Sequence, residues 1–235
     1  ATKIPLRVKP VKVEKEENSK NKVGRPKKGE IKEPKLPTIL EQQQTMQTTQ
    51  EMLALISTKC AVGIKQNSKG NKEVWIGGKL HISAVDGDIP ITAFYSGANV
   101  HDSSVALPLI NETSKRVNYF YDLQDAGYDS EIIRNFSKKL GHRAIIDINP
   151  KNSKELKEKI ELQTQEQKKF KLLHLPQNLD IHHYNQRSMV ERVNKYLKED
   201  FGCNTIYYQG ATKVASVLAF GILSICIHQS LKLVT

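Results

Sequence analysis

The pattern that most constrains the fold is a pair of long apolar segments separated by a DGD turn. Residues 73–85 (EVWIGGKLHISAV) and residues 90–98 (PITAFYSGA) both favour extended strands, and the three polar residues at 86–88 favour a tight reversal between them. A third strand candidate, ISTKCAVGI at 56–64, comes before them and is followed by a polar turn at 66–72. The sequence therefore predicts a three-stranded antiparallel beginning to a sheet.

Alternating helix and strand patterns follow this beginning. Asp102 resembles the N-cap of a helix in HDSSVALPLINET, and VNYFYDLQ after it favours a buried strand. A second helix is expected after DAGYDS, up to about Leu140, and RAIIDI favours another strand. A polar stretch at about 149–183 is either an insert or a helical excursion, and two helices end the chain. The predicted order is βββαβαβ-insert-αα, with strand one either 56–64 or an alternating stub at Ile4–Val8. We expect an α/β protein with a mixed sheet flanked by helices, an order that resembles the ribonuclease H-like fold.

The N-terminal region differs from the rest in composition. Residues 1–40 carry twelve Lys or Arg against five Glu, within a chain of net charge +11. We expect residues 1–55 to form the strand-one stub and a basic flexible linker, with a possible helix at Leu40–Leu55, and residues 56–235 to form a catalytic domain. The linker contains KVGRPKKGE, which resembles an AT-hook; a linker that binds phosphates without sequence preference is the alternative. The charge favours nucleic acid as the partner.

Cysteine and apolar patterns favour a cytoplasmic protein. The three cysteines are far apart and form no metal-ligand spacing, so neither a zinc site nor a disulfide framework is predicted. The longest mainly apolar run, Val214–Ile227, has 14 residues, which is short for a membrane span and predicts a buried core helix. No membrane partner is expected.

One helical stretch, YNQRSMVERVNKYLK, places four polar residues on one face. Because an α-helix advances by about 100° per residue, Tyr184, Arg187, Glu191 and Lys198 fall within a stripe of roughly 60°. The stripe has two interpretations: a solvated face with ion pairs, or a metal-binding carboxylate among groups that hold phosphates. The apolar residues of this helix lie away from the stripe and can pack against a core: Met189, Val190, Val193 and Leu197.

A second acidic residue, Asp125, follows the predicted fourth strand. In the expected fold, strands one and four are adjacent and parallel, so Asp125 lies at the carboxyl edge where ligands bind in open α/β sheets. Glu191 comes from a later helix that can pack over the same edge, and a third acid would come from strand one. Two-metal phosphoryl transfer uses converging acidic ligands of this kind. The alternative is that Asp125 only caps the turn in DAGYDS.

These residues resemble the DDE transposases of bacterial insertion sequences. Tyr184, Arg187, Glu191 and Lys198 match the signature Tyr-x2-Arg-x3-Glu-x6-Lys, and DAGYDS is similar to the second-Asp motif with Asp125 as ligand. The resemblance implies that Asp125 and Glu191 are catalytic and bind Mg²⁺, for which Mn²⁺ can substitute. It also implies that Arg187 and Lys198 contact DNA phosphates while Tyr184 supports the terminal phosphate. The implied partner is double-stranded DNA, at transposon ends and target, bound by a dimer.

The first Asp of such a site is not evident. In one placement, ATKIPLR resembles the end of a strand motif Asp-Ser-Thr-x-Ile, matched by Thr2 and Ile4, and the Asp lies just upstream of Ala1. In the other placement the acid belongs in KCAVG, at the position of Ala61. Asp86 and Asp88 lie in the predicted hairpin, away from Asp125. The sequence thus predicts a transposase that binds element ends and performs strand cleavage and transfer, or a non-catalytic DNA-binding and regulatory remnant of one.

Overall fold

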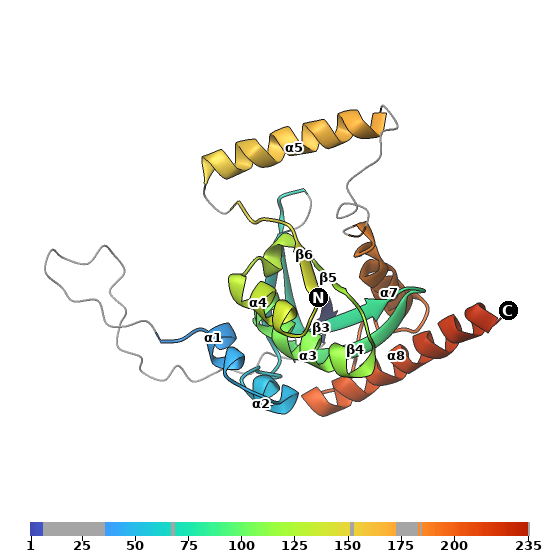
Figure 1. Ribbon diagram of the computed structural model, residues 1–235. Helices are drawn as coiled ribbons and strands as arrows, with labels where there is room; N and C mark the ends of the chain where they lie inside the picture. Colours follow the sequence, from blue (N-terminus) through green and yellow to red (C-terminus); the bar gives the residue numbers. More distant parts are fainter. Residues whose placement is uncertain (7–35, 67–68, 151–152, 173–182, 184, 235) are drawn as a thin grey trace, which may run out of the picture.

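The computed structural model describes residues 1–6, 36–66, 69–150, 153–172, 183 and 185–234. The AT-hook-like segment KVGRPKKGE and Tyr184 both lie outside the described residues. The described part is a mixed α/β fold (Figure 1) in which a sheet built around one long strand is covered by helices.

The long strand is β3 (Lys72–Val85), and three others pair with it antiparallel. They are β1 (Thr2–Pro5), β2 (Ala61–Gln66) and β4 (Ile89–Gly97). The predicted hairpin is confirmed, with a register shift between Ser83 and Ala84. The strand expected at 56–64 begins only at Ala61, because the residues before it pair differently: the carbonyl of Ser57 accepts a hydrogen bond from the N–H of Gly97 at 2.8 Å.

A second sheet has two parallel strands, β5 (Tyr121–Gln124) and β6 (Arg143–Ile146). The expected pairing of strand one with strand four is not found: among the described residues β5 pairs with β6, and β1 pairs with β3. All four residues of β1 are paired with β3. Its continuation at Leu6 forms a parallel bridge to Ile206 instead.

Helices between the strands build one of the two cores. A 3₁₀ turn, η1 (Asp102–Val105), leads into α3 (Ala106–Arg116), and α4 (Glu131–Lys139) crosses from β5 to β6. The helix predicted to begin at Asp102 therefore starts as a 3₁₀ turn, whose N-cap is His101 rather than Asp102. The apolar core formed by these elements contains Met52, Ala106, Leu107, Ile110, Ile133, Phe136 and Ile146.

The single helix considered for Leu40–Leu55 is instead two short helices, α1 (Ile39–Gln44) and α2 (Thr49–Ala54). The break has a local cause, since each helix has its own capping box. Thr38 and Glu41 close the start of α1, and Thr48 and Glu51 close the start of α2. A second N-cap in the middle of the run begins a new helix.

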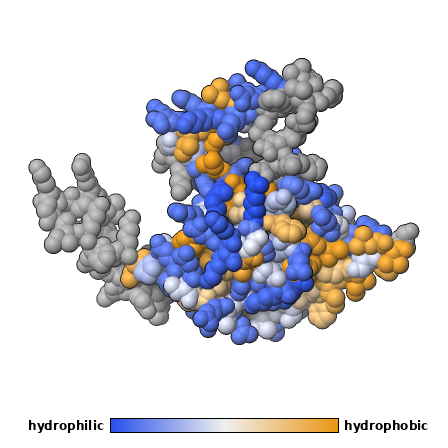
Figure 2. Space-filling model, in the orientation of Figure 1, coloured by the Kyte–Doolittle hydropathy of each residue, from blue (hydrophilic) through white to orange (hydrophobic). Residues whose placement is uncertain are grey.

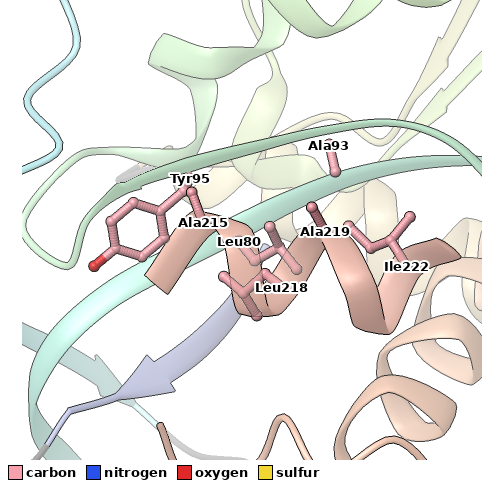
Figure 3. Close-up of a pocket in the computed structure, with 7 residues that line it drawn as sticks. All are labelled: Leu80, Ala93, Tyr95, Ala215, Leu218, Ala219 and Ile222. Carbon is pink, nitrogen blue, oxygen red and sulfur yellow. The ribbon is translucent and has the colours of Figure 1, made fainter. Parts of the chain in front are cut away.

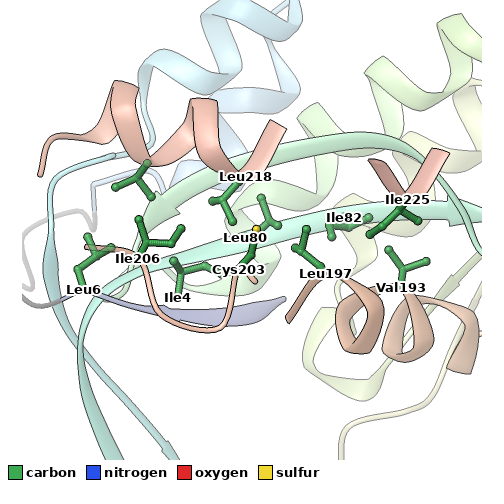
Figure 4. Close-up of a cluster of buried hydrophobic side chains, with 11 residues drawn as sticks. Ile4, Leu6, Leu80, Ile82, Val193, Leu197, Cys203, Ile206, Leu218 and Ile225 are labelled. Atoms are coloured by element: carbon green, nitrogen blue, oxygen red, sulfur yellow. The ribbon is translucent and has the colours of Figure 1, made fainter. Parts of the chain in front are cut away.

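The second core lies between the sheet and the two last helices, α7 (Ser188–Glu199) and α8 (Ala211–Val234). Figure 4 shows side chains from β1, β3 and both helices meeting in one layer. The predicted inward residues Val193 and Leu197 are fully buried here. The cluster consists of Ile4, Leu6, Leu80, Ile82, Val193, Leu197, Cys203, Ile206, Val214, Leu218 and Ile225.

α8 is buried along one side only, which corrects the prediction of a buried core helix. Leu218 and Ile222 pack toward the sheet beside Leu80 and Ala93 around a small recess (Figure 3). The opposite side carries exposed apolar residues and appears as apolar surface in Figure 2. By length and composition alone, α8 is long and apolar enough to cross a membrane. A stripe of this helix is nevertheless part of the core between sheet and helices.

The polar stretch expected at about 149–183 contains one long helix, α5 (Lys154–Leu172). Figure 1 shows α5 at the top of the view, apart from the sheet and the other helices. Its described side chains are exposed or half-buried along its length. A polar helix that buries little surface fits the predicted helical excursion.

Gly221 sets how closely α8 approaches α7. A Cβ at this position would lie 2.7 Å from Leu197 Cδ1 and 2.8 Å from Cys203 Sγ. Helix propensity alone would make Gly221→Ala stabilising by about 1 kcal/mol. We expect the opposite, a loss of about 1–3 kcal/mol in the free energy of unfolding, because the core must shift to accept the methyl group. Urea unfolding measures this, with exposed Ser216→Ala as control; a more stable Gly221→Ala protein would contradict the close approach.

Candidate functional site

Asp125 lies directly after β5 and begins the loop that leads to α4. It is the N-cap of a 3₁₀ turn, η2 (Ala126–Tyr128), and its Oδ1 accepts a hydrogen bond from the N–H of Gly127 at 2.9 Å. The capping role considered from the sequence is therefore present. The side chain is exposed, and the cap uses one carboxylate oxygen, so the geometry leaves Oδ2 available to a ligand.

The loop after Asp125 is fixed by a second aspartate. Asp129 forms an ion pair with Arg134 at 3.0 Å and accepts a hydrogen bond from the N–H of Asn149 at 2.9 Å. Arg134 also donates to the carbonyl of Ile146 at the end of β6. These contacts tie the loop after β5 to α4 and to the carboxyl end of β6, so the backbone that carries Asp125 is held in place.

The start of β1 lies close to Asp125. Desolvation lowers the pKa of the Ala1 α-amino group, while the charges of Asp102 and Asp125 act in the opposite direction. Both carboxylates are thus within electrostatic reach of this amino group. The chain therefore brings together the end of β5, the beginning of β1 and the beginning of η1.

Asp102 is a second acidic residue in this neighbourhood, which the sequence pattern suggested only as a helix cap. Its Oδ1 accepts a hydrogen bond from Lys79 Nζ at 2.8 Å, and Lys79 also donates to the carbonyl of Val100 at 2.8 Å. Burial opposes the shift, but the Lys79 hydrogen bond and the Ala1 amino charge together lower the pKa of Asp102. Asp102 is therefore an ionised partner of Lys79 beside Asp125.

One buried and one half-buried titratable side chain line the same region, His81 and Tyr128. His81 is 1% exposed, and its Nε2 lies 2.8 Å from Ser96 Oγ. Burial lowers the pKa of His81 to about 3, and the positive charge of the Ala1 amino group acts in the same direction, so its imidazole is neutral at pH 7. Burial likewise raises the pKa of Tyr128, with further contributions from the charges of Asp102 and Asp125.

Glu191 lies in the first turn of α7, and its side chain is 72% exposed. Its Oε1 is 3.7 Å from Arg187 Nη1, the ion pair expected for residues four apart. The predicted single helical face is only partly correct, because α7 begins at Ser188 with Arg187 as its N-cap. Glu191 and Lys198 share this helix, while Arg187 precedes it and Tyr184 is outside the described residues.

Two contacts orient α7 toward the strands. Arg192, next to Glu191, forms a bidentate pair with Asp88 in the β3–β4 turn, with Nε to carboxylate oxygen distances of 2.9 and 2.8 Å and a third contact from Nη2 at 2.7 Å. Ahead of the helix, the ring of His183 stacks on Tyr121 of β5 at 4.5 Å between centroids. The segment that leads to Glu191 is thereby attached to the first residue of β5, the strand that Asp125 follows.

The residues fit a divalent metal ion in type but not in number. Carboxylate oxygens such as those of Asp125 and Glu191 are the ligands that Mg²⁺ prefers. Within the part of the chain that the structure describes, however, no group of three or more His, Cys, Asp or Glu side chains is placed to hold a metal ion. The described donor set is therefore incomplete.

The fold and the site together define a class of protein. It is a mixed α/β domain with one accessible carboxylate, Asp125, directly after a parallel strand, and a second, Glu191, on a helix whose preceding segment contacts that strand. The family described as "Transposase DDE domain" matches residues 43–227 of this chain. Since the match covers most of the sequence, the chain belongs to the transposase DDE domain family. No curated protein and no solved structure matches it.

Proposed function

We propose that this chain is the catalytic domain of an insertion-sequence DNA transposase, with a ribonuclease H-like arrangement of its strands. It would bind element ends and perform metal-dependent strand cleavage and transfer. One observation supports the proposal beyond family membership: Asp125, directly after β5, lies within electrostatic reach of the amino group of Ala1, the residue directly ahead of β1. These are the two strand positions at which the acids of such a site are expected to converge.

Asp125 and Glu191 are proposed as metal ligands, with a third acid directly ahead of Ala1. Support for this placement comes from strand register. Thr2 is opposite Leu80, whereas Ala61 is opposite Gly77 on the other side of β3. Ala61 is therefore separated from Thr2 by the width of β3 and also by three residues, roughly 10 Å, along the strand direction. Asp88 is a weak candidate because it is already paired with Arg192.

A bound Mg²⁺ or Mn²⁺ ion would activate the attacking hydroxyl and stabilise the leaving oxygen of the phosphodiester. The chain's own contribution is to hold the two carboxylates and the DNA. Arg187 at the start of α7 and Lys198 near its end would contact backbone phosphates, and Tyr184 would support the terminal phosphate. We further propose that the protein acts as a dimer on DNA in the cytoplasm.

The second candidate is a non-catalytic transposase remnant that occupies element ends and regulates transposition. The observation that favours it is the incomplete donor set among the described residues. Loss of even an indirect metal-supporting contact typically reduces metal affinity or activity about 10- to 100-fold. A site without one of its direct ligands would be weaker still.

The test is Mg²⁺- or Mn²⁺-dependent nicking of plasmid DNA that carries the element's ends. Three forms are compared: the chain itself, the chain with one Asp added ahead of Ala1, and Ala61→Asp. Each is also made with Glu191→Gln. We expect the Asp-extended form to nick DNA, and Glu191→Gln to reduce its rate by about 100-fold or more, because a direct ligand is lost.

The other outcomes are equally informative. Nicking by Ala61→Asp alone would move the first acid to β2. Nicking that survives Glu191→Gln would remove Glu191 from the site. Intact DNA binding with no nicking by any form would support the remnant and contradict the catalytic proposal.

A further inference from the structure

Two lysines, one on each of the strands β1 and β2 that flank β3, lie next to Glu73. Lys3 of β1 places its Nζ 2.7 Å from Glu73 Oε2, although the two residues are 70 positions apart. Lys65 of β2 stands directly opposite Glu73 in the β2–β3 pairing. Lys65 is exposed, and the side chains of Lys3 and Glu73 are 43% and 42% exposed. The two ammonium groups therefore share a single surface around Glu73.

A third lysine reaches this surface from the helical layer. Lys198 follows Leu197 on α7, and Leu197 belongs to the same core cluster as Ile4 of β1, so this part of α7 lies beside β1. Lys3 itself points away from that core, because successive residues of a strand face opposite sides of the sheet. Burial lowers the pKa of Lys198, and the charges of Lys3 and Lys65 lower it further, so the three ammonium groups are close enough to repel one another. None of the ion pairs within the described residues involves Lys198.

Lys65 and Asp125 both act on the amino group of Ala1, directly ahead of β1. Lys65 contributes to lowering the pKa of the Ala1 amino group, whose principal cause is desolvation, and Asp125 acts on the same amino group in the opposite direction. The start of β1 is thus a common neighbour of Lys65 and Asp125. The cation cluster and the candidate catalytic carboxylate belong to one region.

Three cations with one carboxylate leave a local excess of positive charge, and one of the cations is half-buried. Such an arrangement is costly unless an anion neutralises it. We propose that Lys3, Lys65 and Lys198 form one binding site for the backbone phosphates of DNA, in which Glu73 is the counter-ion in the absence of DNA. This inference rests on the proposed function for the identity of the polyanion. The proposed site extends the DNA-binding surface from α7, which carries Lys198, to strands β1 and β2.

Glu73 distinguishes this site from a merely solvated lysine surface, because it predicts opposite effects of removing the carboxylate and of removing a lysine. When a phosphate binds, the Lys3–Glu73 pair competes with it, because the same ammonium group serves both anions. Removing the carboxylate should therefore strengthen DNA binding, while removing any of the three lysines should weaken it. A solvated surface with independent charges would respond far less to Glu73.

The test measures binding of a short labelled duplex by fluorescence anisotropy over a range of salt concentrations. The variants are Lys3→Gln, Lys65→Gln, Lys198→Gln, the triple variant and Glu73→Gln. Lys195→Gln is the matched control, since Lys195 lies on α7 but is 69% exposed and is paired with Glu199 at 3.8 Å. Thermal unfolding of each variant verifies that the fold is intact.

For each neutralised phosphate, the logarithm of the binding constant changes with the logarithm of salt concentration by a slope of about −0.9. We expect each single lysine variant to reduce the magnitude of the slope by about 1, and the triple variant by about 2–3. Glu73→Gln is expected to tighten binding about threefold to tenfold. Lys195→Gln should leave the slope unchanged.

Three results would each overturn the inference. The lysine variants could be folded and keep the unmodified salt slope, Lys195→Gln could reduce the slope as much as they do, or Glu73→Gln could leave DNA affinity unchanged. These results are separable from the nicking assay. A triple variant that keeps the slope while the Asp-extended chain still nicks DNA overturns the phosphate site and leaves the transposase proposal standing. A loss of slope without nicking by any form supports the phosphate site and contradicts catalysis. No DNA binding by the unmodified chain overturns both.

Discussion

Replacing Asp125 by Asn is expected to abolish the binding of Mn²⁺ to the Asp-extended chain, without loss of fold. The carboxylate is exposed, and the only hydrogen bond described for it is the acceptance from Gly127 at 2.9 Å. An Asn side-chain oxygen can accept that same bond, so η2 should still form. The negative charge that a hard cation requires is lost. We expect metal affinity to fall by about 100-fold or more, measured by titration calorimetry or by the Mn²⁺-induced rise of the thermal midpoint.

Asp102→Asn is the matched comparison, because Asp102 lies in the same neighbourhood but is paired with Lys79 at 2.8 Å. This change leaves a largely buried ammonium without its carboxylate, so it should lower the thermal midpoint. It should leave a clear response to Mn²⁺. If Asp102→Asn abolished the metal response and Asp125→Asn did not, the two acids would have to exchange roles.

The contrast between these two aspartates shows what the sequence could and could not predict about the site. Asp125 and Glu191 were predicted because a helical signature and a strand-end motif lie in short, continuous stretches. The ion pair of Asp102 depends on the register of β3, which determines where Lys79 points. Local sequence carries no such register information, and Asp102 therefore read only as a helix cap.

The fold was predictable to a similar degree and for similar reasons. The β3–β4 hairpin was predicted because alternation and the DGD turn are local signals. The arrangement of β1 was not, since its four residues pair with β3 while its continuation meets Ile206, two hundred residues later. The exposed side of α8 was also missed: an apolar run gives the same composition whether one side or all sides are covered.

The second large effect is a pH dependence of stability that originates at His81. Burial lowers the pKa of His81 to about 3 in the folded protein, and the unfolded chain has the ordinary value of 6.5. Between pH 6.5 and 3 the unfolded state therefore binds the additional proton. Stability should rise with pH across this window and be complete above it, with a contribution of up to about 1.4 kcal/mol per pH unit.

The groups that face His81 support this sign. The Ala1 amino group and Lys79 disfavour an imidazolium, whereas Asp102 favours one but is already paired with Lys79. Other groups contribute to the total slope. Burial raises the pKa of Asp122, so its contribution to stability has the opposite trend and is lost as pH rises through its folded-state pKa. The slope of the unmodified protein alone would consequently not identify His81.

A difference measurement isolates the residue. Urea unfolding at pH 7, 6 and 5 is compared for the unmodified chain, His81→Gln and His101→Gln. Gln can keep the hydrogen bond to Ser96 without taking up a proton, so His81→Gln should flatten the pH dependence by about 1 kcal/mol per unit below pH 6. His101 is exposed, and its replacement should leave the slope unchanged. Parallel slopes for the unmodified and His81→Gln proteins would mean that water reaches His81. In that case the region between Asp102 and β4 would be open to water rather than sealed.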